Sequence, residues 1–216
     1  MEQPVNRPHR NGLILLVIIA IFTLPVIFAW FFYKHADEIP TGTTNHGYLI
    51  NPPFQLGQLH VVVIKAPRTN PLKVEHPIKQ TEELVSGKWL IFTLNPKRCE
   101  KACQRGLYNI RQIRLATNAD QNRVVTAVLS FNKPANNDPL NQLLQTDYAG
   151  TYSLRTNEET FKRLAARYIK HNYALLEGAI YIADPLRNVI LVYAPNTDPE
   201  LIYKDLHHLL QVSQIG

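Results

Sequence analysis

The longest hydrophobic pattern of the chain lies near its N-terminus. Residues 12–33 contain no charged side chain, and residues 30–33 are all aromatic. As an α-helix this run is about 33 Å long, enough to cross a hydrocarbon core of about 30 Å. A cleaved signal peptide has a shorter apolar region and a small-residue cleavage site, whereas aromatic residues mark a membrane interface. The pattern therefore predicts one transmembrane helix over residues 12–33.

Further along, the pattern predicts alternating strands and helices. Apolar runs predict strands at residues 45–50, 60–64, 88–94, 123–131, 152–154, 178–184 and 189–193. The first is expected to stop at Pro52 and Pro53, and residues 66–77 to form a loop. Helical spacing predicts helices over residues 98–116 and 139–147, and from Asn157 and Asp198 onward. A strand–helix–strand unit followed by a hairpin and a helix predicts an α/β fold with a mixed sheet.

Composition divides the chain into four parts. We expect a cytoplasmic N-terminus over residues 1–11, the transmembrane helix over 12–33, a stalk rich in Pro, Thr, Gly and Asn over 34–57, and a folded domain over 58–216. Arg7 and Arg10 precede the helix, and Lys34 follows it. Because positive charge stays in the cytoplasm, the chain is predicted to cross the inner membrane once and to hold its domain in the periplasm.

The overall charge changes this picture little. The formal net charge is +6, but no dense stripe of Lys and Arg occurs, so we expect no nucleic-acid partner. The chain has only two cysteines, which cannot make a multi-bridge scaffold. The domain is therefore expected to depend on its own hydrophobic core.

The two cysteines, Cys99 and Cys103, follow the strand at residues 88–94 and open the next helix. Side chains four apart on a helix have Cβ atoms about 5–6 Å apart, slightly more than a disulfide prefers, and a small adjustment of the first turn would close the gap. The helix N-terminus and basic neighbours such as Lys101 favour thiolates. The pair suits a redox couple at an accessible rim or two ligands for Cu(I), and the alternative is a fixed, stabilising disulfide or two inert thiols.

The chain resembles the Sco/SenC proteins, especially small Sco-like membrane proteins of proteobacteria. The resemblance covers roughly residues 45–216 and the anchor, and rests on GKWL at 87–90, CEKAC at 99–103, IYIADPLRN at 180–188 and KDLHHLLQVSQIG at 204–216. It implies a thioredoxin-like domain on a membrane anchor and a role in the assembly of cytochrome c oxidase, with oxidase subunits or other assembly factors as partners.

The resemblance also implies copper, but one ligand position departs from the pattern. Sco proteins have a histidine eight residues before the Asp of the hairpin motif, and counting back from Asp184 gives Leu176. His171 lies five residues earlier and could substitute if the intervening loop folds back. The alternative is a surface histidine at the end of a helix. Copper binding through Cys99 and Cys103 is accordingly expected to be weak or absent.

The leading hypothesis is a factor for assembly of the oxidase copper site, acting through Cys99 and Cys103 by thiol redox chemistry or by handling Cu(I). One alternative is a general thiol–disulfide oxidoreductase for exported substrates. Another is a non-catalytic interaction domain whose cysteines form a structural disulfide. The residues leave open whether the protein is an enzyme.

Overall fold

The computed structural model describes residues 9–34, 45–65, 87–169 and 171–213. The chain divides into two compact units, residues 1–44 and residues 45–216. Each unit is described by itself. The loop expected over residues 66–77 lies outside the described residues.

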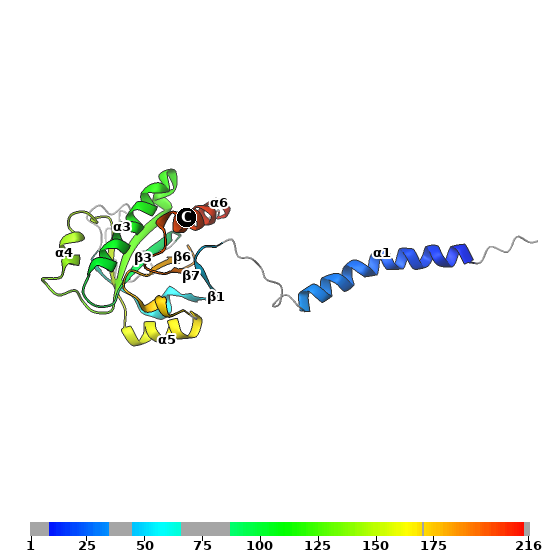
Figure 1. The fold of residues 1–216 in the computed structure, drawn as a ribbon, viewed down its shortest axis with the longest axis horizontal. Coiled ribbons are helices and arrows are strands. Elements are labelled where there is room, and N and C mark those ends of the chain that lie inside the picture. The colour runs from blue at the N-terminus through cyan, green and yellow to red at the C-terminus, as the bar shows by residue number, and fades with distance from the viewer. Residues whose placement is uncertain (1–8, 35–44, 66–86, 170, 214–216) are drawn as a thin grey trace, which may run out of the picture. The chain divides into compact units, whose positions relative to one another are not determined.

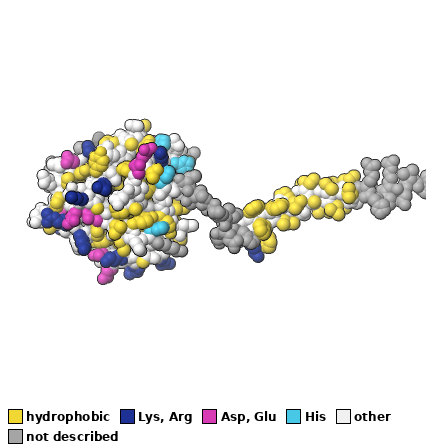
Figure 2. All heavy atoms as spheres, in the orientation of Figure 1, with side chains coloured by type: hydrophobic (Ala, Val, Ile, Leu, Met, Phe, Trp, Pro, Cys, Tyr) yellow, Lys and Arg dark blue, Asp and Glu magenta, His cyan; other side chains and the backbone are white. Residues whose placement is uncertain are grey.

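The described residues of the first unit form the helix α1 (His9–Lys34). Its segment from Gly12 to Lys34 is long and apolar enough to cross a membrane, and Figure 2 shows hydrophobic side chains along it. Pro25 lies inside the helix, and the Thr23 hydroxyl donates a hydrogen bond of 2.8 Å to the carbonyl of Ile19. The prediction of an N-terminal apolar helix of membrane-spanning length is confirmed.

The second unit is built around a mixed sheet, whose described strands follow the order β1-β7-β6-β3-β4-β5-β2. Strand β3 pairs in parallel with β4, and β4 in parallel with β5, while the remaining pairs are antiparallel. The strands are β1 (Tyr48–Gln55), β2 (Val62–Lys65), β3 (Trp89–Asn95), β4 (Val124–Ser130), β5 (Tyr152–Arg155), β6 (Ile180–Ala183) and β7 (Asn188–Tyr193).

Helices cover both faces of the sheet, with α3 and α6 on one side and α5 on the other (Figure 1). The described α-helices of this unit are α3 (Lys101–Ala116), α4 (Pro139–Leu143), α5 (Glu158–Tyr168) and α6 (Pro199–Val212). Short 3₁₀ helices are η1 (Leu56–Leu59), η2 (Asn118–Arg123) and η3 (Asn172–Leu175). Because side chains alternate along a strand, Trp89 and Ile91 of β3 pack on the α3 side, and Leu90 and Phe92 pack on the α5 side.

Local capping chemistry explains where two of the helices begin. The Asn157 side chain accepts the backbone N–H of Thr160 at 3.0 Å at the start of α5. Asp198 accepts the N–H of Glu200 at 2.9 Å at the start of α6, and Pro199 takes the first helical position. The starts predicted at Asn157 and Asp198 are confirmed.

The expected extent of the stalk, by contrast, is wrong at its C-terminal end. Residues 48–55 form β1, which pairs with β7 at one edge of the sheet, and Leu56 donates its N–H to Arg187. Pro52 and Pro53 do not stop the strand. An edge strand tolerates proline because one of its sides needs no N–H donor, and the pairing register shifts between Leu49 and Phe54.

Two helix boundaries also differ from the prediction. The helix expected from residue 98 begins at Lys101, and the one expected over residues 139–147 ends at Leu143. The first difference matters for the chemistry, since it places one cysteine outside the helix.

Candidate functional site

The two cysteines form a disulfide where β3 passes into α3. The S–S distance is 1.98 Å and the Cα atoms are 5.2 Å apart. Glu100 is the N-cap of α3, so Cys103 lies in the first turn while Cys99 lies before the helix. The wider Cβ spacing of two helical residues four apart therefore does not apply. The extended backbone ahead of the helix lets Cys99 approach Cys103.

Both cysteines are buried, which corrects the expectation of an accessible rim. Cys99 is 1% exposed and Cys103 is not exposed. They belong to the hydrophobic cluster beneath α3 that also contains Leu107 and Leu140. Burial follows from the position of Cys103 on the face of α3 that packs on the sheet. Exchange with another thiol thus requires the chain around the helix start to open.

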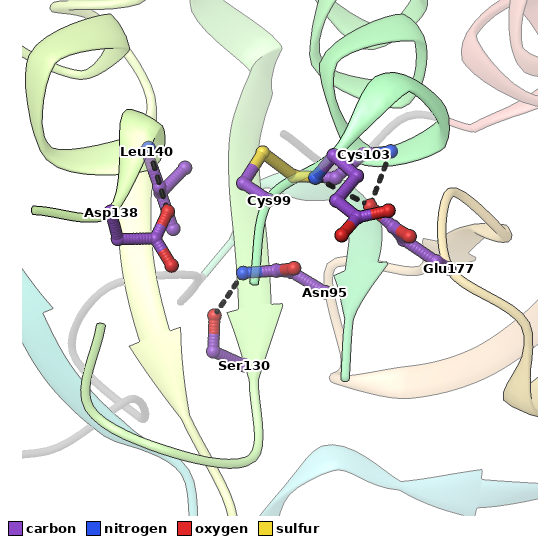
Figure 3. The surroundings of a disulfide bond; sticks show 8 residues. Asn95, Cys99, Cys103, Ser130, Asp138, Leu140 and Glu177 are labelled. Atoms are coloured by element: carbon purple, nitrogen blue, oxygen red, sulfur yellow. Dashed lines mark hydrogen bonds between the residues drawn. A yellow bond between two sulfur atoms is a disulfide. The ribbon is translucent and has the colours of Figure 1, made fainter. Parts of the chain in front are cut away.

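A carboxylate that the sequence analysis missed lies directly at the helix start. Glu177 Oε1 accepts the backbone N–H of Glu100 at 2.8 Å and that of Cys103 at 3.0 Å (Figure 3). The first N–H groups of a helix lack partners within the helix, and the Glu100 side chain does not cap them. Glu177 performs this capping from a loop more than 70 residues away in sequence, so local spacing carries no signal for it.

Polar side chains also lie at the strand ends below the disulfide (Figure 3). Asn95 Nδ2 donates to Ser130 Oγ at 3.3 Å, which joins the ends of the parallel strands β3 and β4. Both side chains are buried, and Asn95 Oδ1 has no hydrogen-bond partner among the described residues. Asp138 accepts the N–H of Leu140 at 2.9 Å and caps α4.

The structure does not bring His171 to the two sulfurs as part of a metal site. Its ring packs against Tyr48, with centroids 4.3 Å apart, and against Tyr173, with centroids 5.0 Å apart. In the described part of the chain, no three His, Cys, Asp or Glu side chains are grouped to hold a metal ion. Leu176, at the position of the Sco histidine, is an exposed apolar side chain. These residues do not fit a three-ligand copper site.

A second polar cluster joins the chain entry to the last helix. Asp205 accepts hydrogen bonds from the backbone N–H groups of His46 and Gly47, at 2.8 and 3.1 Å. The Tyr193 hydroxyl donates to the same carboxylate at 2.9 Å, and His46 Nδ1 lies 2.8 Å from its second oxygen. Burial, followed by the charge of Asp205, raises the pKa of Tyr193 well above its usual range. This cluster ties residues 46–47 to β7 and α6, and its residues lie apart in sequence from the cysteine site.

A known protein family covers the part of the chain that carries the cysteine site. A family described as transmembrane-like, thioredoxin-like, C-terminal domain matches residues 89–213, more than half of the chain. The chain belongs to this family. The match begins at β3 and ends just after α6, so it includes the disulfide, Glu177 and the hairpin of β6 and β7. The predicted fold class, a thioredoxin-like mixed sheet flanked by helices after one apolar N-terminal helix, is thereby confirmed.

Solved structures with a similar fold include several Sco proteins. Apo Sco1 from Thermus thermophilus is 15% identical, with 77% of this chain and 97% of that chain covered and a TM-score of 0.49. A SCO1/SenC family lipoprotein from Bacillus anthracis is 18% identical, with 60% and 85% covered and a TM-score of 0.44. ScoI from Arabidopsis thaliana with copper bound is 19% identical, with 61% and 89% covered and a TM-score of 0.44. None of the curated proteins matches the chain.

Proposed function

We propose that the protein is a membrane-anchored thiol–disulfide protein that serves the assembly of the copper site of cytochrome c oxidase. The observation that carries the proposal is the Cys99–Cys103 disulfide at the turn from β3 into α3 of a thioredoxin-like domain. The choice of cytochrome c oxidase as the target rests on the Sco-like motifs at residues 99–103 and 180–188.

The proposed chemistry is a balanced exchange between two cysteine pairs. In the reduced protein, a thiolate of Cys99 or Cys103 attacks one sulfur of a disulfide in the partner and forms a mixed disulfide. The second cysteine then attacks this bond, which releases the partner as a dithiol and re-forms the Cys99–Cys103 bond. Two electrons and two protons pass to the partner, so no further reductant takes part in the step.

In this proposal the domain works in the periplasm. Two arginines precede the apolar segment and a single lysine follows it. Because positive charge is retained in the cytoplasm, this difference favours a cytoplasmic N-terminus. Oxidase subunits or other assembly factors at the outer face of the inner membrane are then within reach of the tethered domain. An oxidising compartment also suits a cysteine pair that persists as a disulfide.

We place thiol exchange ahead of copper handling because of the ligands that are present. The reduced pair offers two sulfur ligands, Leu176 offers none, and His171 packs against Tyr48 and Tyr173. Titration of the reduced full-length protein with Cu(I) tests this ordering. We expect weak binding, and tight binding of one Cu(I) per chain would reverse the order.

The burial of both sulfurs supports a second candidate function, an interaction domain with a structural disulfide. The reduction potential separates the two candidates. A structural disulfide has a potential below about −300 mV, and a working couple lies above it. The potential is measured on the detergent-solubilised full-length protein in dithiothreitol redox buffers.

The deciding experiment replaces the cysteines in the cell. In membranes of a strain that carries Cys99→Ser and Cys103→Ser, we expect loss of oxidase activity with the variant protein still present by immunoblot. Gln104→Ser, at an exposed neighbour of Cys103, is the matched control and should keep activity. Full oxidase activity in the double variant would overturn the proposed function.

A further inference from the structure

The disulfide has a negatively charged side chain at the place where a thioredoxin-like helix start would stabilise a thiolate. Glu177 Oε1 accepts the N–H groups of Glu100 and Cys103, at 2.8 and 3.0 Å. The second of these N–H groups belongs to one of the two cysteines. Reduction of the bond therefore creates a thiol on Cys103, whose own backbone N–H is bonded to a carboxylate.

The loop that carries Glu177 is packed closely on the start of α3. Gly178 follows it with a φ of +81°, and a Cβ atom there would lie 2.6 Å from the carbonyl oxygen of Ala102. The Gly178 N–H donates to the carbonyl of Leu94 at 2.8 Å, which joins the loop to the end of β3. A Cβ atom on Gly106 would lie 3.3 Å from Gly178 Cα. The backbone on the C-terminal side of Glu177 is thus packed on α3, which carries Cys103, and bonded to the end of β3, which leads to Cys99.

Other charged groups around the cysteines act from more exposed positions. Lys97, Arg98 and Lys101 are exposed on the approach to α3, and so is Glu100. From the α4 side, the buried Asp138 is occupied by the N–H of Leu140. Exposed charges are screened by solvent, whereas Glu177 acts through direct hydrogen bonds to the helix start.

We propose that Glu177 sets the redox poise of the Cys99–Cys103 pair by disfavouring its thiolate form. A helix N-terminus stabilises a thiolate because its free N–H groups carry partial positive charge. Glu177 occupies two of these groups and adds a full negative charge, so the reduced pair stays protonated and the disulfide is the favoured state. Glu177 is a positioning and tuning residue, and the inference rests on the proposed function only in assuming that the bond is reduced in use.

The reaction used in the test is exchange with dithiothreitol. The S–S bond of the protein breaks and an S–S bond forms within dithiothreitol, while two electrons and two protons pass to Cys99 and Cys103. Reduced proteins whose thiolates are stabilised have strongly oxidising disulfides. Removal of the Glu177 charge is accordingly expected to shift this equilibrium toward the reduced protein.

The test compares Glu177→Gln with the wild type in the detergent-solubilised full-length protein. Glutamine keeps an oxygen that accepts both N–H groups but carries no charge. At a pH above the thiol pKa, we expect the equilibrium constant for reduction to rise about tenfold for each unit by which the variant lowers that pKa, and a tenfold rise corresponds to 29.6 mV. The matched control is Glu100→Gln, which removes the same charge next to Cys99 from a side chain that caps nothing and should shift the equilibrium much less.

A second readout measures the thiolate directly through the pH dependence of alkylation of the reduced protein. In the wild type we expect an apparent thiol pKa at or above about 8.5, the value of a free cysteine. Glu177→Gln should lower it. Equal potentials and equal alkylation profiles in Glu177→Gln and the wild type would overturn the proposal. A wild-type thiol pKa below about 7 would also overturn it, and this measurement does not depend on the folding of a variant.

Failure of this inference is distinct from failure of the proposed function. If the cysteine variants keep full oxidase activity but Glu177→Gln shifts the potential, the assembly role falls and the tuning by Glu177 stands. If the cysteine variants lose activity and Glu177→Gln shifts neither potential nor alkylation, the assembly role stands and Glu177 only caps the helix.

Discussion

Two carboxylates in this domain accept backbone N–H groups from distant parts of the chain, yet their surroundings differ. Asp205 is buried and takes two N–H groups, the Tyr193 hydroxyl and the His46 ring. Glu177 is half-buried and takes two N–H groups through one oxygen, next to the disulfide. The same capping contact stabilises the fold where the carboxylate is enclosed, and we propose that it tunes thiol chemistry where the carboxylate caps the helix of the disulfide.

Removal of the enclosed carboxylate of Asp205 should cause the greatest loss of stability. Asp205→Ala leaves Tyr193 and the N–H groups of His46 and Gly47 without their acceptor, and we expect a loss of about 3 kcal/mol in the free energy of unfolding. Urea unfolding of the detergent-solubilised full-length protein measures it. Glu200→Ala removes an exposed carboxylate from the same helix and should change stability far less. Equal losses in the two variants would show that the hydrogen bonds of Asp205 do not contribute to the free energy of unfolding.

The next effect is a loss of stability in alkali. Burial raises the pKa of Tyr181 and of Tyr193 well above that of an unfolded tyrosine, about 10. Above pH 10 the unfolded chain loses protons that the folded chain keeps, so the contribution of these two tyrosines to stability is constant below that pH and falls above it. Each buried tyrosine contributes about 1.4 kcal/mol per pH unit.

The variant Tyr193→Phe tests this assignment. Unfolding free energies measured between pH 9 and pH 11.5 should fall less steeply above pH 10 than in the wild type, by up to about 1.4 kcal/mol per pH unit. The matched comparison is the exposed Tyr108→Phe, which should leave the slope unchanged. A slope in Tyr193→Phe as steep as that of the wild type would mean that Tyr193 ionises freely in the folded protein.

A smaller effect tests how tightly the chain entry packs on the Asp205 cluster. A Cβ atom on Gly47 would lie 2.5 Å from Cε1 of the buried Tyr193 ring, which Asp205 holds in place. We expect Gly47→Ala to lose about 2 kcal/mol in urea unfolding because the ring must shift. Gly150→Ala, where a Cβ meets nothing within 4 Å, should be neutral or slightly stabilising. Unchanged stability in Gly47→Ala would indicate a loosely packed entry.

The smallest loss of stability is expected at the cysteine site, where Glu177 is compared with Asp205. Glu177→Gln keeps both hydrogen bonds to the helix start, so we expect it to lose less than about 1 kcal/mol in the free energy of unfolding. Asp205→Asn removes the same charge from the buried cluster and should lose more. A Glu177→Gln variant as destabilised as Asp205→Asn would make Glu177 a structural residue like Asp205.

Much of the fold follows from patterns within a few residues. The apolar run of β3, the hairpin of β6 and β7, and the caps Asn157 and Asp198 were predicted because strands, turns and helix ends depend on neighbours close in sequence. The same holds for α1, whose length and lack of charge are local properties. The proximity of Cys99 and Cys103 also belongs here, since only four positions separate them.

Contacts between distant segments could not be predicted from the sequence. The residues near 52–53 do not indicate that β1 lies at a sheet edge where prolines are tolerated. The residues near Asp205 do not indicate that its side chain binds the backbone N–H of His46. Local patterns were enough to predict most strands, the caps, the apolar helix and the closeness of the two cysteines, while a bond between them was one of several hypotheses. The burial of the disulfide and the capping of its helix by Glu177 follow only from the fold, because burial and long-range capping depend on which loops the folded sheet brings together.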